Sequence, residues 1–137
     1  MNNFNVLLVD DELEFLATLV KRLTRRGLNI STAKNGKDAL KIIGAKVIDV
    51  VVLDVRMPGI DGIQTLREIK KKDPLMEVIM LTGHASVEVA IEGMELGAFD
   101  YLMKPADIDD LFYKLQDAFK KKTIQREKIK KLEEIIR

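Results

Sequence analysis

The sequence predicts an α/β fold: a doubly wound, five-stranded parallel sheet in the order 2-1-3-4-5, with an extended C-terminal helix. Five short apolar runs alternate with stretches in which apolar residues recur at helical spacing. The runs are almost continuously apolar, which is typical of parallel strands covered on both faces. This alternation indicates strand–helix–strand units with right-handed crossovers, and 137 residues suit one such domain.

Each predicted strand is a short apolar run that ends at polar or turn-forming residues. The run 28–33 alternates only weakly, as a strand near the edge of a sheet does. The run 48–53 is aliphatic except at Asp49, which indicates a buried strand. The five predicted strands are residues 4–9, 28–33, 48–53, 77–82 and 99–104.

The predicted helices carry apolar stripes and recognisable boundaries. Gly27 and Gly97 supply helix stops, the latter in a left-handed conformation. Asp61 is placed to cap the third helix, which Pro74 ends. The five predicted helices are residues 12–26, 35–45, 62–72, 86–97 and 107 to the end.

Composition and charge exclude several classes of function. The chain has no cysteine, which rules out disulfides, thiolate metal sites and cysteine nucleophiles. It has no secretion-signal pattern and no apolar run near about 18 residues, so we expect a cytoplasmic protein without a membrane partner. Residues 120–137 hold 8 basic and 3 acidic residues, whereas the acidic remainder argues against general nucleic-acid binding. The basic tail is either a solvated helix face or a contact for an acidic partner or nucleic acid.

Polar residues follow the predicted strands at their carboxyl ends, where doubly wound folds place their chemistry. Individually, each has an ordinary interpretation as a helix cap, a turn residue or a solvated charge. Together, three converging carboxylates would repel one another unless a cation lay between them, and oxygen ligands without histidine or cysteine favour Mg²⁺. The residues are Asp10 and Asp11 after strand 1, Asp54 after strand 3, Thr82 at the end of strand 4 and Lys104 at the end of strand 5.

This group of residues predicts phosphoryl chemistry. A carboxylate can attack a phosphoryl group and form an acyl phosphate. Mg²⁺, the Lys104 ammonium and the Thr82 hydroxyl would then neutralise the three equatorial oxygens of the transferring group. We therefore expect Asp54 to be a phosphoryl acceptor, held rigidly by the buried strand that precedes it.

Four motifs give the chain a resemblance to a known family. They are the acidic pair after the first strand, LDVRMPGIDG around Asp54, MLTGHA at the fourth strand and YLMKP at the fifth. Over about residues 4–120 the chain resembles the receiver domain of two-component response regulators. GMELGAFDYLMKP is most similar to receivers of the nitrogen-regulation, enhancer-binding type and of hybrid kinases. The implied division is a receiver domain over residues 1–120 and a helical extension or linker over residues 121–137.

The resemblance implies a phosphorylation-activated signalling switch. Asp54 would take a phosphoryl group from a sensor histidine kinase or a phosphotransfer protein. The chain would not be an enzyme beyond catalysing its own phosphorylation and dephosphorylation. The surface of helix 4, strand 5 and helix 5 would change and control dimerisation or an output partner. Nucleic acid would be contacted only through an output domain that this chain lacks, so the chain would be a truncated regulator or a small stand-alone one.

The resemblance also implies a ligand set for Mg²⁺. Asp11 and Asp54 would bind the ion directly, and Asp10 would act mainly through a metal-bound water. The backbone carbonyl of Arg56 would complete the protein ligands.

Further residues acquire switching roles from the same resemblance. Thr82 would swing toward the phosphate, and Tyr101 would follow it as the switch aromatic. A cis peptide bond at Lys104–Pro105 would aim the lysine side chain into the site. Arg56 and His84 would flank the attacking water and shield the phosphate, which predicts slow hydrolysis.

The last predicted helix continues beyond the usual length of a receiver. Its final apolar positions suit the a and d sites of a parallel two-stranded coiled coil, which would form a homodimer, and a solvated helix is the alternative. The seam consists of Leu111, Leu115, Ala118, Lys122, Gln125, Ile129, Leu132 and Ile136.

Two other functions compete with the signalling switch. A Mg²⁺-dependent phosphatase of the haloacid-dehalogenase type also uses an aspartyl phosphate. It requires a second aspartate two residues after the nucleophile, where this chain has Arg56. A docking module that no longer takes phosphate is the other candidate, but retention of all five site residues argues against it.

Overall fold

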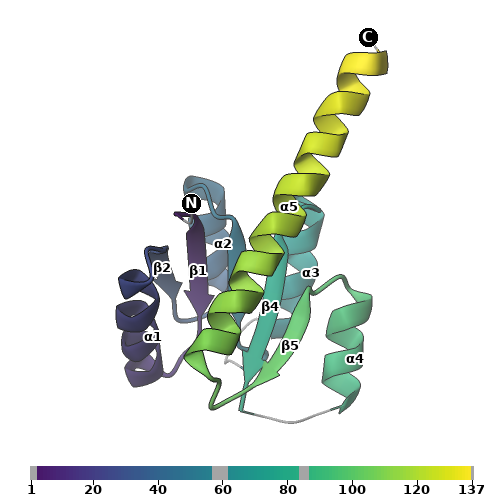
Figure 1. The fold of residues 1–137 in the computed structure, drawn as a ribbon. Helices are drawn as coiled ribbons and strands as arrows, with labels where there is room; N and C mark the ends of the chain where they lie inside the picture. Colours follow the sequence, from purple (N-terminus) through teal and green to yellow (C-terminus); the bar gives the residue numbers. More distant parts are fainter. Residues whose placement is uncertain (1–2, 57–61, 84–86, 137) are drawn as a thin grey trace.

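A computed structural model describes residues 3–56, 62–83 and 87–136 of the chain (Figure 1). Within these residues, five parallel strands form one sheet in the order β2-β1-β3-β4-β5, which confirms the predicted fold class. The edge position of β2 explains its weak alternation. The strands are β1 (Asn5–Val9), β2 (Asn29–Ala33), β3 (Val50–Leu53), β4 (Glu77–Thr82) and β5 (Asp100–Met103).

In the described part of the chain, five helices alternate with the strands and end close to the predicted boundaries. Gly27 and Gly97 have φ values of 89° and 101°, the left-handed conformation that ends a helix most easily at glycine. The predicted cap at Asp61 lies outside the described residues, as does His84. The helices are α1 (Leu13–Arg25), α2 (Gly36–Ala45), α3 (Gly62–Lys72), α4 (Val87–Glu95) and α5 (Ile108–Ile136).

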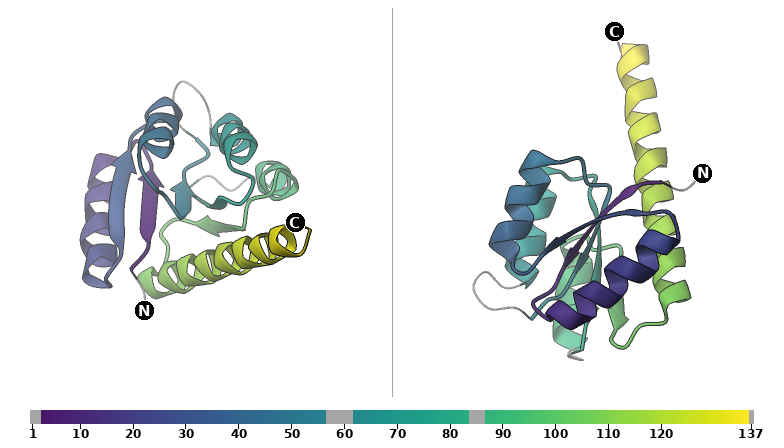
Figure 2. Two further views of the ribbon diagram at one scale, coloured as in Figure 1. Left: turned by 90° about the horizontal axis from the view of Figure 1, so that it is seen from above. Right: turned by 90° about the vertical axis from the view of Figure 1, so that its left-hand side faces the viewer.

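The helices form two layers, one on each face of the sheet (Figure 2). α1 and α5 cover one face, and α2, α3 and α4 cover the other. Successive residues of β3 alternate between the two cores: Val50 and Val52 pack under α1 and α5, and Val51 and Leu53 under the other three helices. Burial of β3 on both faces accounts for its nearly uninterrupted apolar sequence.

A buried lysine marks the point where α5 leaves the sheet. The Lys122 ammonium donates a hydrogen bond to the backbone carbonyl of Ile48 at 3.1 Å and lies 3.8 Å from the Asp49 carboxylate. Asp49 in turn accepts a bond from the backbone N–H of Asn5. Burial lowers the pKa of Lys122, opposed by the charge of Asp49. These contacts fix α5 at the amino ends of the strands, opposite the predicted site.

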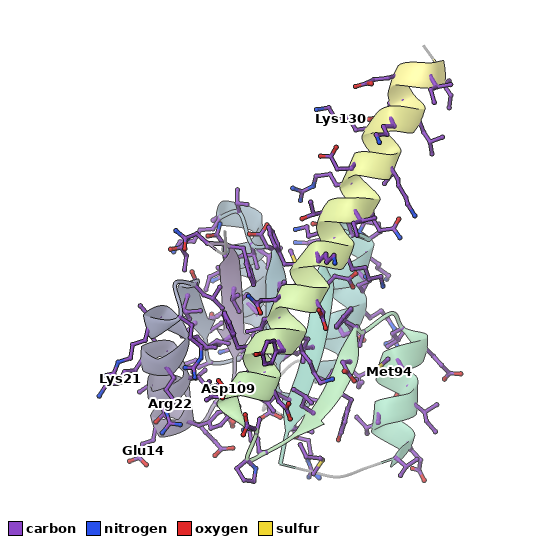
Figure 3. All side chains as sticks on the ribbon, viewed as in Figure 1. Glu14, Lys21, Arg22, Met94, Asp109 and Lys130 are labelled. Atoms are coloured by element: carbon purple, nitrogen blue, oxygen red, sulfur yellow. The ribbon has the colours of Figure 1, made fainter. Side chains whose placement is uncertain are left out.

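Beyond Lys122, α5 extends away from the rest of the structure (Figures 1 and 3). Every described residue of this extension is exposed, including Lys130, which projects from it in Figure 3. Its exposed apolar side chains are Ile124, Ile129, Leu132, Ile135 and Ile136. Within the described ranges, none of the helices combines the length and apolar character needed to cross a bilayer.

Candidate functional site

Two buried aspartates meet where β1 and β3 end. Val9 and Leu53 are paired in register, so Asp10 and Asp54 leave adjacent strands at the same edge of the sheet. The backbone N–H of Asp54 donates to the Val9 carbonyl at 2.9 Å, which carries the pairing one residue further. Asp10 is 3% exposed and Asp54 4%, so both carboxylates have lost most of their hydration. This position is the topological switch point, where the order of the strands reverses and where a doubly wound fold binds its ligands.

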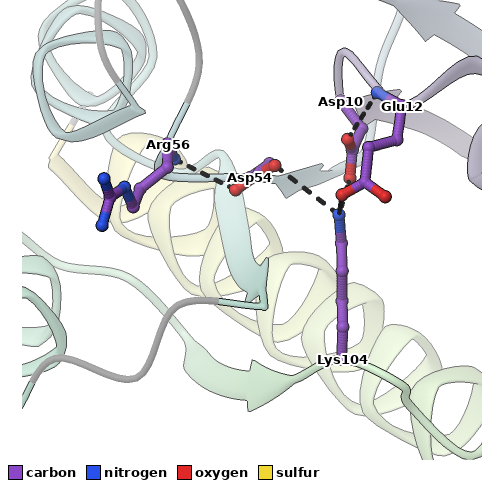
Figure 4. Close-up of polar contacts among 5 residues, drawn as sticks. All are labelled: Asp10, Glu12, Asp54, Arg56 and Lys104. Carbon is purple, nitrogen blue, oxygen red and sulfur yellow. Dashed lines mark hydrogen bonds and ion pairs between the residues drawn. The ribbon is translucent and has the colours of Figure 1, made fainter.

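Lys104 reaches these carboxylates from the end of β5 (Figure 4). Its ammonium nitrogen lies 2.6 Å from Asp10 Oδ2, 2.7 Å from Glu12 Oε1 and 3.6 Å from Asp54 Oδ2. The same nitrogen lies 4.3 Å from the centre of the Phe15 ring. The lysine therefore contacts the β1–α1 loop more closely than it contacts Asp54.

Local backbone bonds orient the Asp54 carboxylate. Its Oδ1 accepts the backbone N–H of Arg56 at 3.0 Å, while its Oδ2 faces Lys104. One residue further on, the Val55 carbonyl accepts the backbone N–H of Gly62 at 3.2 Å, which ties the start of α3 to the segment after β3. Main-chain N–H groups thus orient the Asp54 carboxylate and hold the start of α3 against Val55.

The electrostatics show a site with more negative charge than its lysine neutralises. Burial raises the pKa of Asp10 and the Asp54 charge adds to this, against the opposing hydrogen bonds from Lys104 and the Glu12 N–H. Burial alone would lower the pKa of Lys104, but its hydrogen bonds to Asp10 and Glu12 outweigh that effect and raise it. A further cation would therefore be stabilised here.

Three carboxylates could supply oxygen ligands to such a cation. One oxygen from each of Asp10, Glu12 and Asp54 lies within 4.8 Å of the other two. The set contains only hard oxygen donors, which fit Mg²⁺ and are poor ligands for softer metals. The residues present therefore fit the magnesium that the sequence predicts.

Glu12 belongs to this group, whereas the sequence predicts that Asp11 lies with Asp10 and Asp54. Asp11 is exposed, and among the described residues it does not belong to the group of converging carboxylates. Glu12 has extended backbone angles (φ −84°, ψ 95°), and residues two apart in extended chain face the same side. The Glu12 side chain consequently returns to the side of Asp10. The alternation of side chains along extended chain was the sequence signal that could have identified Glu12. The adjacent acids Asp10 and Asp11 form a conspicuous pair that obscured this signal.

The other predicted switch residues lie near the same edge. Thr82 ends β4, is wholly buried, and accepts the Lys104 backbone N–H at its carbonyl at 2.9 Å. Tyr101 lies on β5, half-buried against the apolar layer beneath α2–α4. The Lys104–Pro105 peptide bond is cis. Arg56 is exposed, and its side chain extends away from Lys104 in Figure 4.

The order of the sheet and the carboxylate–lysine group at its switch point define a flavodoxin-like α/β protein with a receiver-type site. Residues 6–116 match the family described as the response regulator receiver domain, and the chain belongs to this family.

The relatives support an NtrC-like subtype. The chain is 41% identical over 117 residues to the transcriptional regulatory protein ZraR of Escherichia coli K12, a match over 85% of this chain and 26% of ZraR. It is 40% identical over 105 residues to the DNA-binding transcriptional regulator NtrC of the same strain, a match over 77% of this chain and 22% of NtrC. The chain thus spans about a quarter of the length of these relatives.

The fold agrees with a solved receiver structure along nearly the whole length of that structure. The crystal structure of a response regulator receiver domain protein from Clostridium thermocellum superposes with a TM-score of 0.85 and 38% identity. The superposition covers 89% of this chain and 98% of the other.

Proposed function

We propose that the chain is a phosphorylation-dependent switch in which Asp54 accepts a phosphoryl group. The observation that carries this proposal is the placement of the buried Asp54 carboxylate, with one oxygen on the Arg56 N–H and the other 3.6 Å from the Lys104 ammonium. The acceptor is thus oriented, and a cation lies beside the position where new negative charge would develop. The family suggests a phosphohistidine on a kinase or phosphotransfer protein as the donor. The reaction would then take place in the cytoplasm.

The transfer needs no proton from the acceptor. An ionised Asp54 oxygen attacks phosphorus, and an O–P bond forms while the donor's N–P bond breaks. The imidazole of the donor leaves with the bonding electron pair and takes a proton from solvent. Lys104 then interacts with a phosphoryl oxygen, and the Thr82 hydroxyl is proposed to bond another after moving toward it.

Magnesium is proposed to be held by the carboxylates at the ends of β1 and β3. Asp10 and Asp54 belong to the converging group, and Asp11 and the Arg56 carbonyl remain proposed ligands from the family resemblance. The ion would supply positive charge against the phosphoryl oxygens. Glu12 is the additional carboxylate that the structure brings within reach.

The proposed output is a change at α4, β5 and α5. Gly93 is the single buried residue of α4 within the described range, so most of the surface of this helix stays accessible to a partner. A Cβ on Gly93 would lie 2.2 Å from the Met80 terminal methyl, so the helix already packs as closely on β4 as that glycine allows. α4 carries exposed apolar side chains, among them Ile91 and Met94, and Met94 is labelled in Figure 3. Tyr101 is proposed to shift with Thr82, and Arg56 and His84 to shield the phosphate.

The helical extension is proposed to be a linker that pairs with a second copy of the chain. Lys122 fixes the helix where it leaves the sheet, and Ile129, Leu132 and Ile136 continue the buried seam onto exposed helix at coiled-coil spacing. Two such helices would cover these side chains. Residues 121–137 would then transmit the switch to a dimer.

We expect Leu132→Ser to weaken dimerisation by at least about tenfold, because it removes a central apolar side chain from the seam. Glu134→Ser, on the other side of the helix, is the control and should leave association unchanged. Sedimentation equilibrium measures both. If the wild-type chain is a monomer at all concentrations reached, or if both variants associate equally, pairing through this seam is wrong.

The phosphoryl-acceptor proposal is tested by incubating the wild-type protein with acetyl phosphate, with Mg²⁺ or with EDTA. Intact-mass spectrometry should show one added phosphoryl group with Mg²⁺ and a strongly reduced amount with EDTA. Continuous turnover of the donor without retained phosphate would indicate a phosphatase. No modification under either condition would indicate a docking module and contradict the proposal.

A further inference from the structure

The Lys104 ammonium has unequal contacts at the site. Its two short bonds, 2.6 Å to Asp10 and 2.7 Å to Glu12, both go to residues between β1 and α1. Its distance to the Asp54 carboxylate is 3.6 Å, longer than a good hydrogen bond. The Phe15 ring lies on the same α1 side, 4.3 Å from the ammonium. The lysine is therefore held toward α1 and away from the proposed acceptor.

Of the two short contacts of Lys104, the ion pair with Glu12 is the one that can be broken more easily. The Glu12 side chain is 62% exposed, whereas the Asp10 side chain is 5% exposed. An exposed carboxylate keeps most of its hydration and loses little when its ion pair breaks. The position of Glu12 is defined nevertheless, because its backbone N–H donates to Asp10 Oδ1 at 2.9 Å. Glu12 can hold Lys104 in the resting protein and release it at low cost.

We propose that Glu12 is a positioning residue that tethers Lys104 in the unphosphorylated state and competes with the phosphoryl group for its ammonium. The inference rests on the proposed function, because it gives the phosphoryl group on Asp54 as the competitor. Phosphorylation adds strong acceptor oxygens beside Lys104, and the lysine moves from Glu12 to these oxygens. Glu12 thereby lowers the stability of the phosphorylated state without contacting the phosphoryl group.

The test uses beryllofluoride, a phosphoryl mimic, at saturating Mg²⁺ for each variant. Its dissociation constant is measured by fluorine NMR on the full chain. Glu12→Gln keeps the size of the side chain and removes its charge, so we expect it to bind beryllofluoride about two to five times more tightly, as the loss of an exposed ion pair implies. Glu14→Gln is the control: Glu14 is another exposed acid at the start of α1, and its neutralisation should leave the affinity unchanged.

A second background separates the tether from a general loss of charge or of metal binding. With Lys104→Gln present, Glu12→Gln should no longer change the affinity, because the tethered group is gone. The metal-free protein gives an independent readout. The Lys104 side-chain ammonium resonance should shift in Glu12→Gln and stay in place in Glu14→Gln, and this readout decides the matter if Lys104→Gln binds too weakly to measure.

The outcomes distinguish this inference from the proposed function. Unchanged or weaker beryllofluoride binding by Glu12→Gln, an equal effect in both backgrounds, or an unmoved Lys104 resonance would overturn the tether while leaving Asp54 as the acceptor. Failure of the wild-type protein to bind beryllofluoride with Mg²⁺ would overturn both.

Discussion

Gly62→Ala is expected to lower the free energy of unfolding by about 3 kcal/mol, because an alanine methyl has no space at this position. A Cβ built on Gly62 would lie 2.1 Å from the Val55 Cα and 2.6 Å from the Asp54 carbonyl oxygen. Both atoms belong to the backbone and cannot rotate away as a side chain can. The substitution must therefore displace either the start of α3 or the segment that carries Asp54. Urea denaturation followed by circular dichroism measures the loss.

Gly44→Ala is the matched control for this substitution. Gly44 lies in α2, and among the described residues a Cβ there would meet no atom within 4 Å apart from its chain neighbours and the backbone of its own helix. Alanine in a helix is favoured over glycine, so this variant should be more stable than the wild-type protein by about 0.5–1 kcal/mol. If Gly62→Ala unfolds at the wild-type urea concentration, the close approach of Gly62 to the backbone of Asp54 and Val55 is not a constraint on the fold.

Asp54→Asn is expected to abolish phosphoryl incorporation from acetyl phosphate in the presence of Mg²⁺. The amide is a poor nucleophile and carries no charge, so neither the attack on phosphorus nor the charge balance with Lys104 survives. The shape of the side chain is retained, and the fold should be as well. Intact-mass spectrometry after donor treatment measures the incorporation.

Asp49→Asn provides the comparison for that result. Asp49 is also a buried aspartate, 8% exposed, but it lies at the opposite end of the sheet beside Lys122. The same chemical change there should leave the labelling at the wild-type level. Equal labelling of Asp54→Asn and the wild-type protein would show that another side chain accepts the phosphoryl group.

The fold could be predicted from the sequence because three signals indicated the same helices and strands. They are the spacing of the apolar residues, the burial that this spacing implies and the residues that end helices or form turns. The continuous apolar character of β3 indicated burial on both faces, and the helix layers that cover the two faces of the sheet explain that burial. Gly27 and Gly97 marked helix ends because both need the left-handed conformation that glycine adopts most easily. These signals are local, and the tertiary structure keeps the elements that they predict.

Parts of the candidate site depended on tertiary contacts that local patterns do not encode. The sequence predicted that Asp10, Asp54 and Lys104 lie together at the carboxyl ends of the strands, and the structure places them there. The inclusion of Glu12 depends on the return of its side chain at the N-terminus of α1, which one-dimensional spacing shows only weakly. The preference of Lys104 for Glu12 over Asp54 depends on side-chain conformation, for which the sequence holds no signal.

Long-range electrostatic contacts were also outside the reach of sequence patterns. Lys122 occupied a polar position in an apolar helical seam, and nothing nearby in the chain identified its partners. They are the carbonyl of Ile48 and the carboxylate of Asp49, both 73 or more residues away, and they become visible only when α5 packs across β3.

Reduction of the phosphorylated wild-type protein with borohydride tests the central claim most directly, since an acyl phosphate is reduced to an alcohol while an unmodified carboxylate is not. Peptide sequencing by mass spectrometry then locates the residue that carried the phosphoryl group. The account predicts homoserine at position 54 and at no other aspartate, and only after incubation with donor and Mg²⁺. An unreduced aspartate at position 54 in protein that carries phosphate, or a phosphoryl group on any other side chain, would contradict it.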